Sequence, residues 1–228
     1  NLFAQAPLKR PAKPKQQKTQ VAKPQPQSVK PKPATRGRHQ GYEWVDLGLP
    51  SGLKWATCNV GATRPERMGD YFSWGETYSK GEYQTSNYKW GDDGDIQKYC
   101  TDSEAGIVDG REKLLLSDDA ARSQWGGYWR IPTKEECQEL RTQCNWKWTQ
   151  KNGVNGQMVT GPNGNSIFLP AAGYREAGYV EEAGECGYYW TSTLNTSTMA
   201  DCLFCLPGGG GVMFWARFAG CTVRAVTE

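Results

Sequence analysis

Short apolar runs alternate with polar, Gly-rich segments along most of the chain after residue 40, and long apolar helices are missing. The runs are rich in β-branched and aromatic residues and are bounded by Gly, Pro and Asn, which is typical of short strands joined by turns. The pattern predicts strands at residues 42–47, 53–59, 71–74, 166–169, 188–191, 201–206, 212–218 and 222–226.

Two segments carry helical signals instead. Thr133 is a natural N-cap and Glu136 completes a capping box, after which Cys137, Leu140 and Cys144 share one helical face. Cys137 and Cys144 therefore either pair or are both buried as small apolar side chains.

A second, shorter helix is predicted at residues 117–125. Ser117 is its expected cap, and Asp118 and Asp119 lie near the positive end of the helix dipole. This position favours a structural role for the two acids over a metal site.

Composition divides the chain at residue 40. Residues 1–40 contain ten basic side chains, no acid, seven of the 13 prolines and no Trp or Tyr, whereas residues 41–228 carry a net charge of −7 with all ten Trp and all 11 Tyr. We expect residues 1–40 to be a disordered, semi-rigid tether, because they have too few apolar groups to offset their ordering entropy. Its basic charge fits a solvated linker or contact with an anionic envelope better than nucleic acid, since base-stacking aromatics are lacking.

The start of the chain resembles the end of a secretory signal. A short apolar piece leads into an A-x-A pattern at Ala4-Gln5-Ala6, although Pro7 follows directly. No stretch approaches the ~20 apolar residues of a membrane span. We therefore expect an exported protein of the cell surface, periplasm or extracellular space, and its eight cysteines are compatible with an oxidising compartment, with their pairing left open.

A series of ordered blocks resembles a known family. They are YEWVDLGLPSGLKWATCNVGA at 42–62, GDYFSWGET at 69–77, KYCT at 98–101, WGGYWRIPT at 125–133, NG at 155–156, GPNGNSIFLPAAGY at 161–174, GYYWTS at 187–192 and Val223-Arg224. Together they span nearly all of residues 41–228 and resemble the Fibrobacter succinogenes major paralogous domain, abundant in Bacteroides-like bacteria. That family is similar to C-type-lectin-like proteins, in the branch shared with formylglycine-generating enzymes and with target proteins of diversity-generating retroelements.

The resemblance implies an α+β, C-type-lectin-like fold with small twisted antiparallel sheets, two helices and many loops. It also implies a variable recognition surface near the C-terminus, which is rich in Asn and Tyr in relatives. Here residues 200–226 contain no Asn or Tyr. Adenine mutagenesis of Asn codons yields most residue types in this window but never Met or Trp, so Met213 and Trp215 would belong to an unvaried frame. Ordinary drift in an apolar terminal sheet is the alternative.

This window is poor in charge and rich in aromatic and small residues, the composition of a protein-binding hot spot. We expect ligand contacts, including a polar Arg–Asp pair of handles, from Asp201, Cys202, Phe204, Phe214, Trp215, Ala216, Arg217, Phe218, Ala219 and Cys221. Strand alternation predicts that about half of the aromatics face the core. The expected partner is a protein or glycan on another cell or on a phage, with no cofactor and no metal.

Two other functions compete with this interpretation. A calcium-independent glycan-binding module is possible because Trp and Tyr faces stack on sugars, whereas Asp92–Asp95 lacks the spacing of a calcium loop and reads as a solvated turn. A formylglycine-generating type of oxidase would need an active cysteine pair. Cys202 and Cys205 are spaced more closely than in those enzymes, and the single histidine, His39, lies in the predicted tail. We therefore expect no enzymatic activity.

Overall fold

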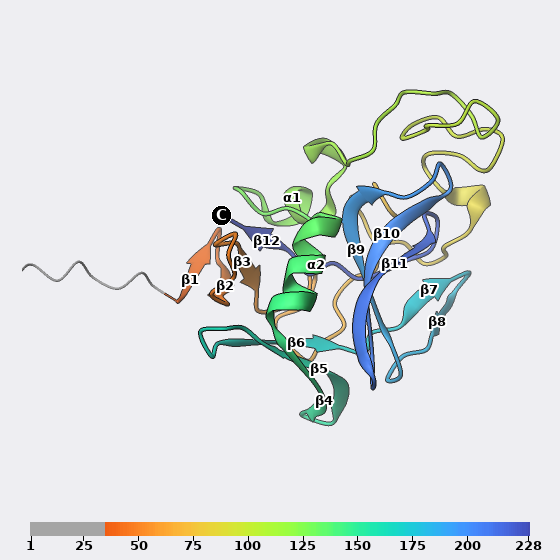
Figure 1. Ribbon diagram of the computed structural model, residues 1–228. Helices are drawn as coiled ribbons and strands as arrows, with labels where there is room; N and C mark the ends of the chain where they lie inside the picture. The colour runs from red at the N-terminus through yellow and green to blue at the C-terminus, as the bar shows by residue number, and fades with distance from the viewer. Residues whose placement is uncertain (1–34) are drawn as a thin grey trace, which may run out of the picture. The chain divides into compact units, whose positions relative to one another are not determined.

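The computed structural model describes residues 35–228, where four small antiparallel sheets and two helices are joined by long loops (Figure 1). This arrangement confirms the α+β, loop-rich class. The helices are α1 at Ala120–Trp125 and α2 at Lys134–Gln143. No helix in this part of the chain is long and apolar enough to cross a membrane.

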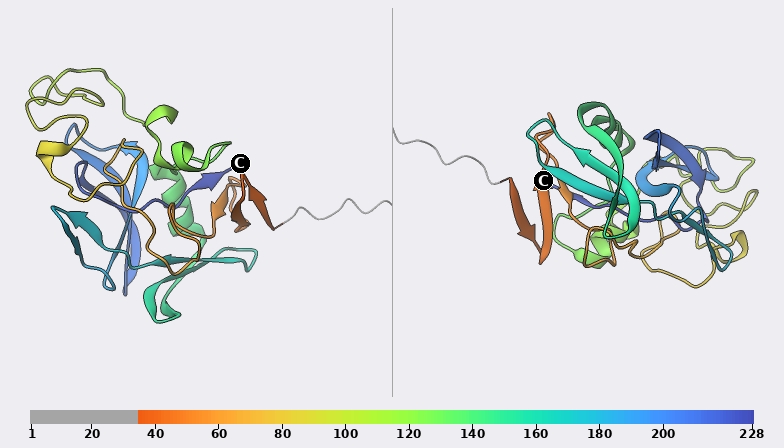
Figure 2. Two further views of the ribbon diagram at one scale, coloured as in Figure 1. Left: turned by 180° about the vertical axis from the view of Figure 1, so that it is seen from behind. Right: turned by 90° about the horizontal axis from the view of Figure 1, so that it is seen from below.

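The first sheet joins the two ends of the described chain. Its order is β1-β2-β3-β12, and its strands are β1 at Arg36–His39, β2 at Tyr42–Asp46, β3 at Lys54–Ala56 and β12 at Val226–Thr227. Val226 of β12 pairs with Trp55 of β3, so the last strand of the chain joins the sheet formed by the first three strands (Figures 1 and 2).

The other three sheets form from strands that follow one another along the chain. Their orders are β4-β5-β6, β7-β8 and β11-β10-β9. The strands are β4 at Asn145–Lys151, β5 at Val154–Thr160, β6 at Ser166–Pro170, β7 at Tyr174–Glu176, β8 at Tyr179–Glu181, β9 at Gly187–Leu194, β10 at Met199–Leu206 and β11 at Gly209–Ala216.

The predicted strands are confirmed where apolar residues are dense. Those at 42–47, 166–169, 188–191, 201–206 and 212–218 correspond to β2, β6, β9, β10 and β11, although β11 begins earlier and ends at Ala216. The strand predicted at 53–59 shortens to β3, the one at 71–74 is a single bridge between Phe72 and Cys221, and the one at 222–226 overlaps β12 only at Val226. Polar strands β1, β4, β5, β7 and β8 were missed because their stability comes from pairing rather than from an apolar run.

Helix α2 begins where the local signals place it. The Thr133 hydroxyl accepts a hydrogen bond from the Glu136 amide at 3.3 Å, and the Glu136 carboxylate accepts one from the Thr133 amide at 2.8 Å. Arg130 adds a bidentate ion pair to Glu136 at 2.6 and 2.7 Å. Cys137 is buried, but Cys144 is the C-cap, so the two do not share a helical face. All eight cysteines are free thiols.

The cap of α1 is Asp119, and the prediction of Ser117 is wrong. A 3-10 turn at Leu116–Asp118 precedes the helix. Asp119 accepts hydrogen bonds from the Arg122 amide at 2.9 Å and the Ile131 amide at 2.7 Å. Asp118 pairs with Lys98 instead. Both acids have structural roles, as expected.

The folded domain starts before residue 41, so the predicted tail is too long. Strand β1 pairs with β2 from Arg36↔Val45 to His39↔Tyr42. The His39 carbonyl accepts a hydrogen bond from the Trp129 indole at 2.8 Å, and its Nε2 accepts one from the Tyr128 amide at 2.7 Å. Tyr128 and Trp129 are distant from His39 in sequence, so the composition of residues 1–40 could not indicate these contacts. The rest of the predicted tail, residues 1–34, lies outside the described residues.

The sheet β9-β10-β11 separates two buried clusters. Trp190 and Cys202 point into a cluster built around Trp74 and Trp129, whereas Tyr189 and Leu203 point into one beneath α2. The central strand β10 is buried on both faces from Ala200 to Leu203, whereas Phe204 and Leu206 near its end are half-buried. The position of this sheet between the two clusters determines which residues of the C-terminal region reach the surface.

Candidate functional site

The ten residues predicted for recognition fall into two environments. Phe214 is 55% exposed. The half-buried ones are Phe204, Trp215, Ala216 and Phe218. At most 2% of the surface is exposed in Asp201, Cys202, Arg217, Ala219 and Cys221. The prediction that these five contact a ligand is wrong, since both faces of β10 are covered and the chain after β11 passes into the core.

Arg217 is the clearest correction. Its Nε donates to the Tyr88 hydroxyl at 3.0 Å, Nη1 to the Tyr99 carbonyl at 3.0 Å, and Nη2 to the Lys98 carbonyl at 2.9 Å. The guanidinium also lies 5.0 Å from the Trp74 ring centroid. Arg217 therefore ties the loop before α1 to the end of β11 and is buried out of reach of a partner.

Asp201, the other expected polar handle, is equally occupied. Its carboxylate pairs with Lys134 at 3.0 Å and accepts a hydrogen bond from the Asn195 side chain at 2.9 Å. Asp201 and Arg217 are therefore not a pair of handles; each connects a different loop or helix to β10 or β11.

Cys202 and Cys205 do not come together. They are three residues apart on one strand and so point to opposite faces, each into a different buried cluster. Burial raises the pKa of the Cys205 thiol to about 12 and that of the Cys202 thiol still further. A pair of sealed, protonated thiols on opposite faces offers no chelate and no redox couple.

Acidic and metal-ligating side chains are likewise dispersed. Between residues 35 and 228 no three His, Cys, Asp or Glu side chains form a metal-binding group. Asp92 and Asp95 form a turn, with the Asp95 amide donating to the Asp92 carbonyl at 2.9 Å.

Aromatic rings gather on one face of the C-terminal sheet. We call Tyr174, Tyr188, Phe204 and Trp215 the aromatic patch. Trp215 lies 4.9 Å from Tyr174 and 4.8 Å from Tyr188, measured between ring centroids, and Tyr188 lies 5.2 Å from Phe204. Tyr188 is buried and the other three are half-buried. The patch is the exposed rim of the Trp-rich cluster, where the β7–β8 hairpin lies beside β9–β11 (Figures 1 and 2).

The β7–β8 hairpin and the loop after it make the border of this patch acidic. Glu176, Glu181 and Glu182 are exposed, and none of them forms an ion pair within the described part of the chain. Burial, followed by the charges of Glu182, Glu176 and Glu181, raises the pKa of Tyr174. Tyr188 donates to Glu182 at 2.8 Å. The patch is therefore an apolar surface with an anionic edge.

A small hollow of about 160 Å³ lies at the end of β11. Its lining includes Ala216 and Phe218, together with Tyr88, Asp92 and Met199. Arg217 forms part of its floor while keeping only 1% of its surface exposed. Three of the predicted residues are thus brought together here, around a space large enough for one side chain.

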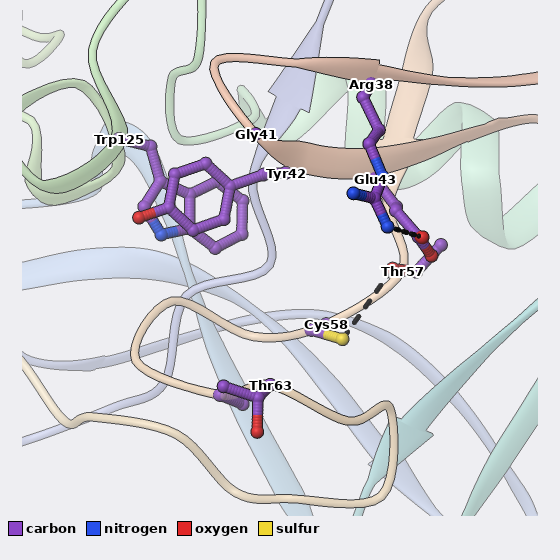
Figure 3. Close-up of a pocket in the computed structure, with 9 residues that line it drawn as sticks. Arg38, Gly41, Tyr42, Glu43, Thr57, Cys58, Thr63 and Trp125 are labelled. Atoms are coloured by element: carbon purple, nitrogen blue, oxygen red, sulfur yellow. Dashed lines mark hydrogen bonds and ion pairs between the residues drawn. The ribbon is translucent and has the colours of Figure 1, made fainter.

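A second, larger hollow lies between the β1–β2 hairpin and α1 (Figure 3). We call it the hairpin hollow; its volume is about 290 Å³, and Arg38, Tyr42, Glu43 and Trp125 are among its lining residues. Sequence reasoning missed it because Arg38 was assigned to the tail.

Tyr174 and Tyr188 were also missed as site residues. Strand alternation carried a usable signal, because Tyr188 pairs in register with Phe204 and must share its face. The contact of Tyr174 with Trp215 had no such signal, since it depends on how the β7–β8 hairpin docks.

Comparison of the chain with models of known families, with curated proteins and with solved structures found no match. The α+β class stands on the observed sheets and helices. The C-type-lectin-like fold stays a prediction from the motifs.

Proposed function

We propose that the chain is a ligand-binding protein of C-type-lectin-like fold that holds a protein partner against the aromatic patch. The observation that carries the proposal is the contact between half-exposed Trp215, Tyr174 and Phe204 and buried Tyr188. Aromatic side chains supported by neighbours and open on one side are the usual anchors of protein interfaces.

The position of the patch supports rigid presentation. Phe204 and Trp215 stand on hydrogen-bonded strands, and the ring of Tyr188 beneath them is held by its bond to Glu182. Rings fixed before binding lose little conformational entropy when a partner arrives. The acidic border favours a partner segment that carries Lys or Arg, by charge complementarity.

The proposal includes export and display at a cell surface, for binding to another cell or to a phage. Its support is the A-x-A pattern at residues 4–6 and the family resemblance. Nucleic acid is a poor partner for the domain, because residues 41–228 carry a net charge of −7 that repels phosphates.

Diversification by a retroelement stays a prediction, and the burial of individual residues reduces the number of positions that could vary. Among the ten residues predicted for recognition, the exposed or half-buried ones compatible with mutated Asn codons are Phe204, Phe214, Ala216 and Phe218. Buried positions such as Arg217 tolerate little change. A near-copy of the 3′ coding segment beside a reverse transcriptase gene, differing only at adenines, is the expected finding. Sequencing that finds no such copy removes diversification and leaves the binding proposal intact.

Selection of a random peptide library on the immobilised protein tests the binding proposal. We expect enriched peptides that contain basic and aromatic residues. Trp215→Ser should weaken their binding at least ~30-fold, since loss of an anchor costs about 2 kcal/mol or more. Tyr128→Ser is the matched control, because Tyr128 is 73% exposed, stacks on His39 and contacts no ring of the patch; it should change binding less than ~3-fold.

Melting temperatures of both variants show that each is folded. Enriched peptides that bind Trp215→Ser as tightly as the wild type would refute the proposal. A glycan array run with and without EDTA covers the alternative of a calcium-independent glycan-binding module. A signal that persists in EDTA and is lost in Trp215→Ser would favour that alternative at the patch, and a strong EDTA-sensitive signal would assign the protein to calcium-dependent sugar binding instead.

A further inference from the structure

The hairpin hollow has an aromatic wall that is held in place from behind. The Tyr42 and Trp125 rings stack with centroids 4.1 Å apart and planes 12° apart (Figure 3). Trp125 is the last residue of α1 and packs edge-on against buried Trp129 at 5.0 Å. Because Trp125 is itself 7% exposed, the wall cannot swing away, and half-buried Tyr42 presents it to the hollow.

A charged pair lies across the hollow from this wall (Figure 3). Arg38 and Glu43 pair in register between β1 and β2, and the Arg38 Nη2 donates to the Glu43 carboxylate at 2.7 Å. Their side chains are 68% and 54% exposed, respectively. A guanidinium has five N–H donors and a carboxylate about four acceptor sites, so most of their hydrogen-bonding capacity remains for a ligand. The Thr57 and Thr63 hydroxyls add neutral donors and acceptors.

A neighbouring hollow of about 250 Å³ extends the site on the other side of this pair. It shares Arg38, Glu43 and Thr57 with the hairpin hollow and has Trp44 in its wall. Gly37 makes room for that ring, since a Cβ there would lie 2.4 Å from the Trp44 side chain. Each hollow therefore combines an aromatic ring with the same polar pair.

We propose that these two hollows form a calcium-independent binding site for a neutral oligosaccharide. Sugar rings have C–H faces that pack on aromatic rings and hydroxyls that both donate and accept hydrogen bonds, which is what each hollow supplies. The volume of about 290 Å³ is at the lower end of the ~300–1,000 Å³ of small-ligand sites. Adjacent sugar units would occupy the two hollows and share the Arg38–Glu43 pair.

Charge selects this ligand class over others. Glu43 disfavours phosphates and other anions, and Arg38 disfavours cations, so the pair suits a ligand without net charge. A purely apolar ligand would leave the charged groups desolvated without partners. The site is separate from the aromatic patch, so the proposal goes beyond the binding function assigned to that patch.

The test is titration calorimetry of the full chain with unbranched neutral oligosaccharides of glucose, mannose, xylose and galactose, in EDTA. We expect saturable binding of at least one of them. Arg38→Ala should weaken it at least ~10-fold, and Tyr42→Leu, which keeps apolar volume but removes the ring, should weaken it similarly. Tyr42→Phe keeps the stack and should retain binding within ~3-fold.

Arg111→Ala is the control, because Arg111 is 48% exposed, forms an ion pair with Asp109 at 2.8 Å and lines neither hollow. It should bind the saccharide as the wild type does. The proposal is overturned if no oligosaccharide binds at ~10 mM, if Arg38→Ala binds as well as the wild type, or if Trp215→Ser abolishes saccharide binding. The last result would move sugar recognition to the aromatic patch, whereas peptide binding by an Arg38→Ala protein leaves the patch proposal standing.

Discussion

Two arginines are buried without a carboxylate partner, and this explains much of the C-terminal geometry. Arg217 bonds to the Tyr88 hydroxyl and backbone carbonyls, and Arg224 donates to the Asn59 side chain and the Phe168 carbonyl, both at 2.9 Å. Burial lowers the pKa of Arg224. A planar fork of donors satisfies several carbonyls at once, which an ammonium group at the end of a flexible chain cannot do. From sequence alone, an arginine that contacts a ligand cannot be distinguished from one that is buried as a structural anchor.

Arg217→Lys should therefore lower the free energy of unfolding by at least about 2 kcal/mol, because buried carbonyls lose their donors. Phe214→Ser, at an exposed neighbouring position, should change it by no more than about 0.5 kcal/mol. Urea unfolding of both variants measures the difference. Equal stabilities would mean that Arg217 is not the anchor described here.

The single carboxylate of Asp119 links stability to pH. Burial raises its pKa to about 6, although hydrogen bonds from the Arg122 and Ile131 amides work in the opposite direction. Between pH ~4 and ~6 the folded protein holds a proton that the unfolded chain has lost, so this group makes stability fall as pH rises through that window. Asp119→Asn removes the titration and keeps one of the two acceptor oxygens, so the lost hydrogen bond is a pH-independent offset.

We expect the wild type to lose stability relative to Asp119→Asn from pH 4 to pH 6, with no further change above ~7. Urea unfolding of the two proteins at matched pH values gives this difference, and other carboxylates cancel in it. A difference that is constant across the range contradicts the assignment.

At the scale of elements, the two helices differ in how well their neighbouring residues predict the N-cap. The cap of α2 lies within four consecutive residues, Thr133 to Glu136, so the sequence places it correctly. The cap of α1 also holds the Ile131 amide, which is far outside the helix, and that contact selects Asp119 over Ser117. A cap with a tertiary partner is invisible to a local pattern.

Thr133→Ala should lower the free energy of unfolding by about 1 kcal/mol, because an N-cap hydroxyl satisfies an otherwise unpaired helical amide. Thr142→Ala, near the end of the same helix, is the control. The Thr142 hydroxyl donates to the Gln138 carbonyl at 2.9 Å, and that carbonyl lies inside α2, where the helical backbone also satisfies it. Loss of the Thr142 hydroxyl should therefore change stability little. Thermal unfolding distinguishes the two, and equal losses would show that the capping box adds nothing.

At the scale of the whole domain, the first and last strands close one sheet. Strand β1 pairs with β2, and β12 with β3, so residues at both ends of residues 35–228 hold the same layer. His39 connects this sheet to Tyr128 and Trp129. The hairpin hollow lies where the β1–β2 hairpin of this sheet meets α1.

A chain that begins at Gly41 should be less stable than one that begins at Thr35 by at least about 2 kcal/mol. It loses the β1–β2 pairing and the two hydrogen bonds of His39, each of which contributes about 1 kcal/mol. The chain from Thr35 is the control, because it keeps β1 and His39. Equal melting temperatures for the two shortened chains would contradict the domain boundary.

Sequence alone determined the features that depend on neighbours along the chain, namely the capping box of α2 and the apolar strands. The alternation of side chains along a strand and the capping of a helix each involve only a few consecutive residues, so the local sequence predicts them. Only the tertiary structure decided that Arg217 and Asp201 are internal, that Tyr174 contacts Trp215, and that Arg38 lines the same hollow as the Tyr42–Trp125 stack. Each of these depends on two segments distant in sequence meeting in space, and burial on both sides of β10 is a property of the layers that cover it rather than of its own residues.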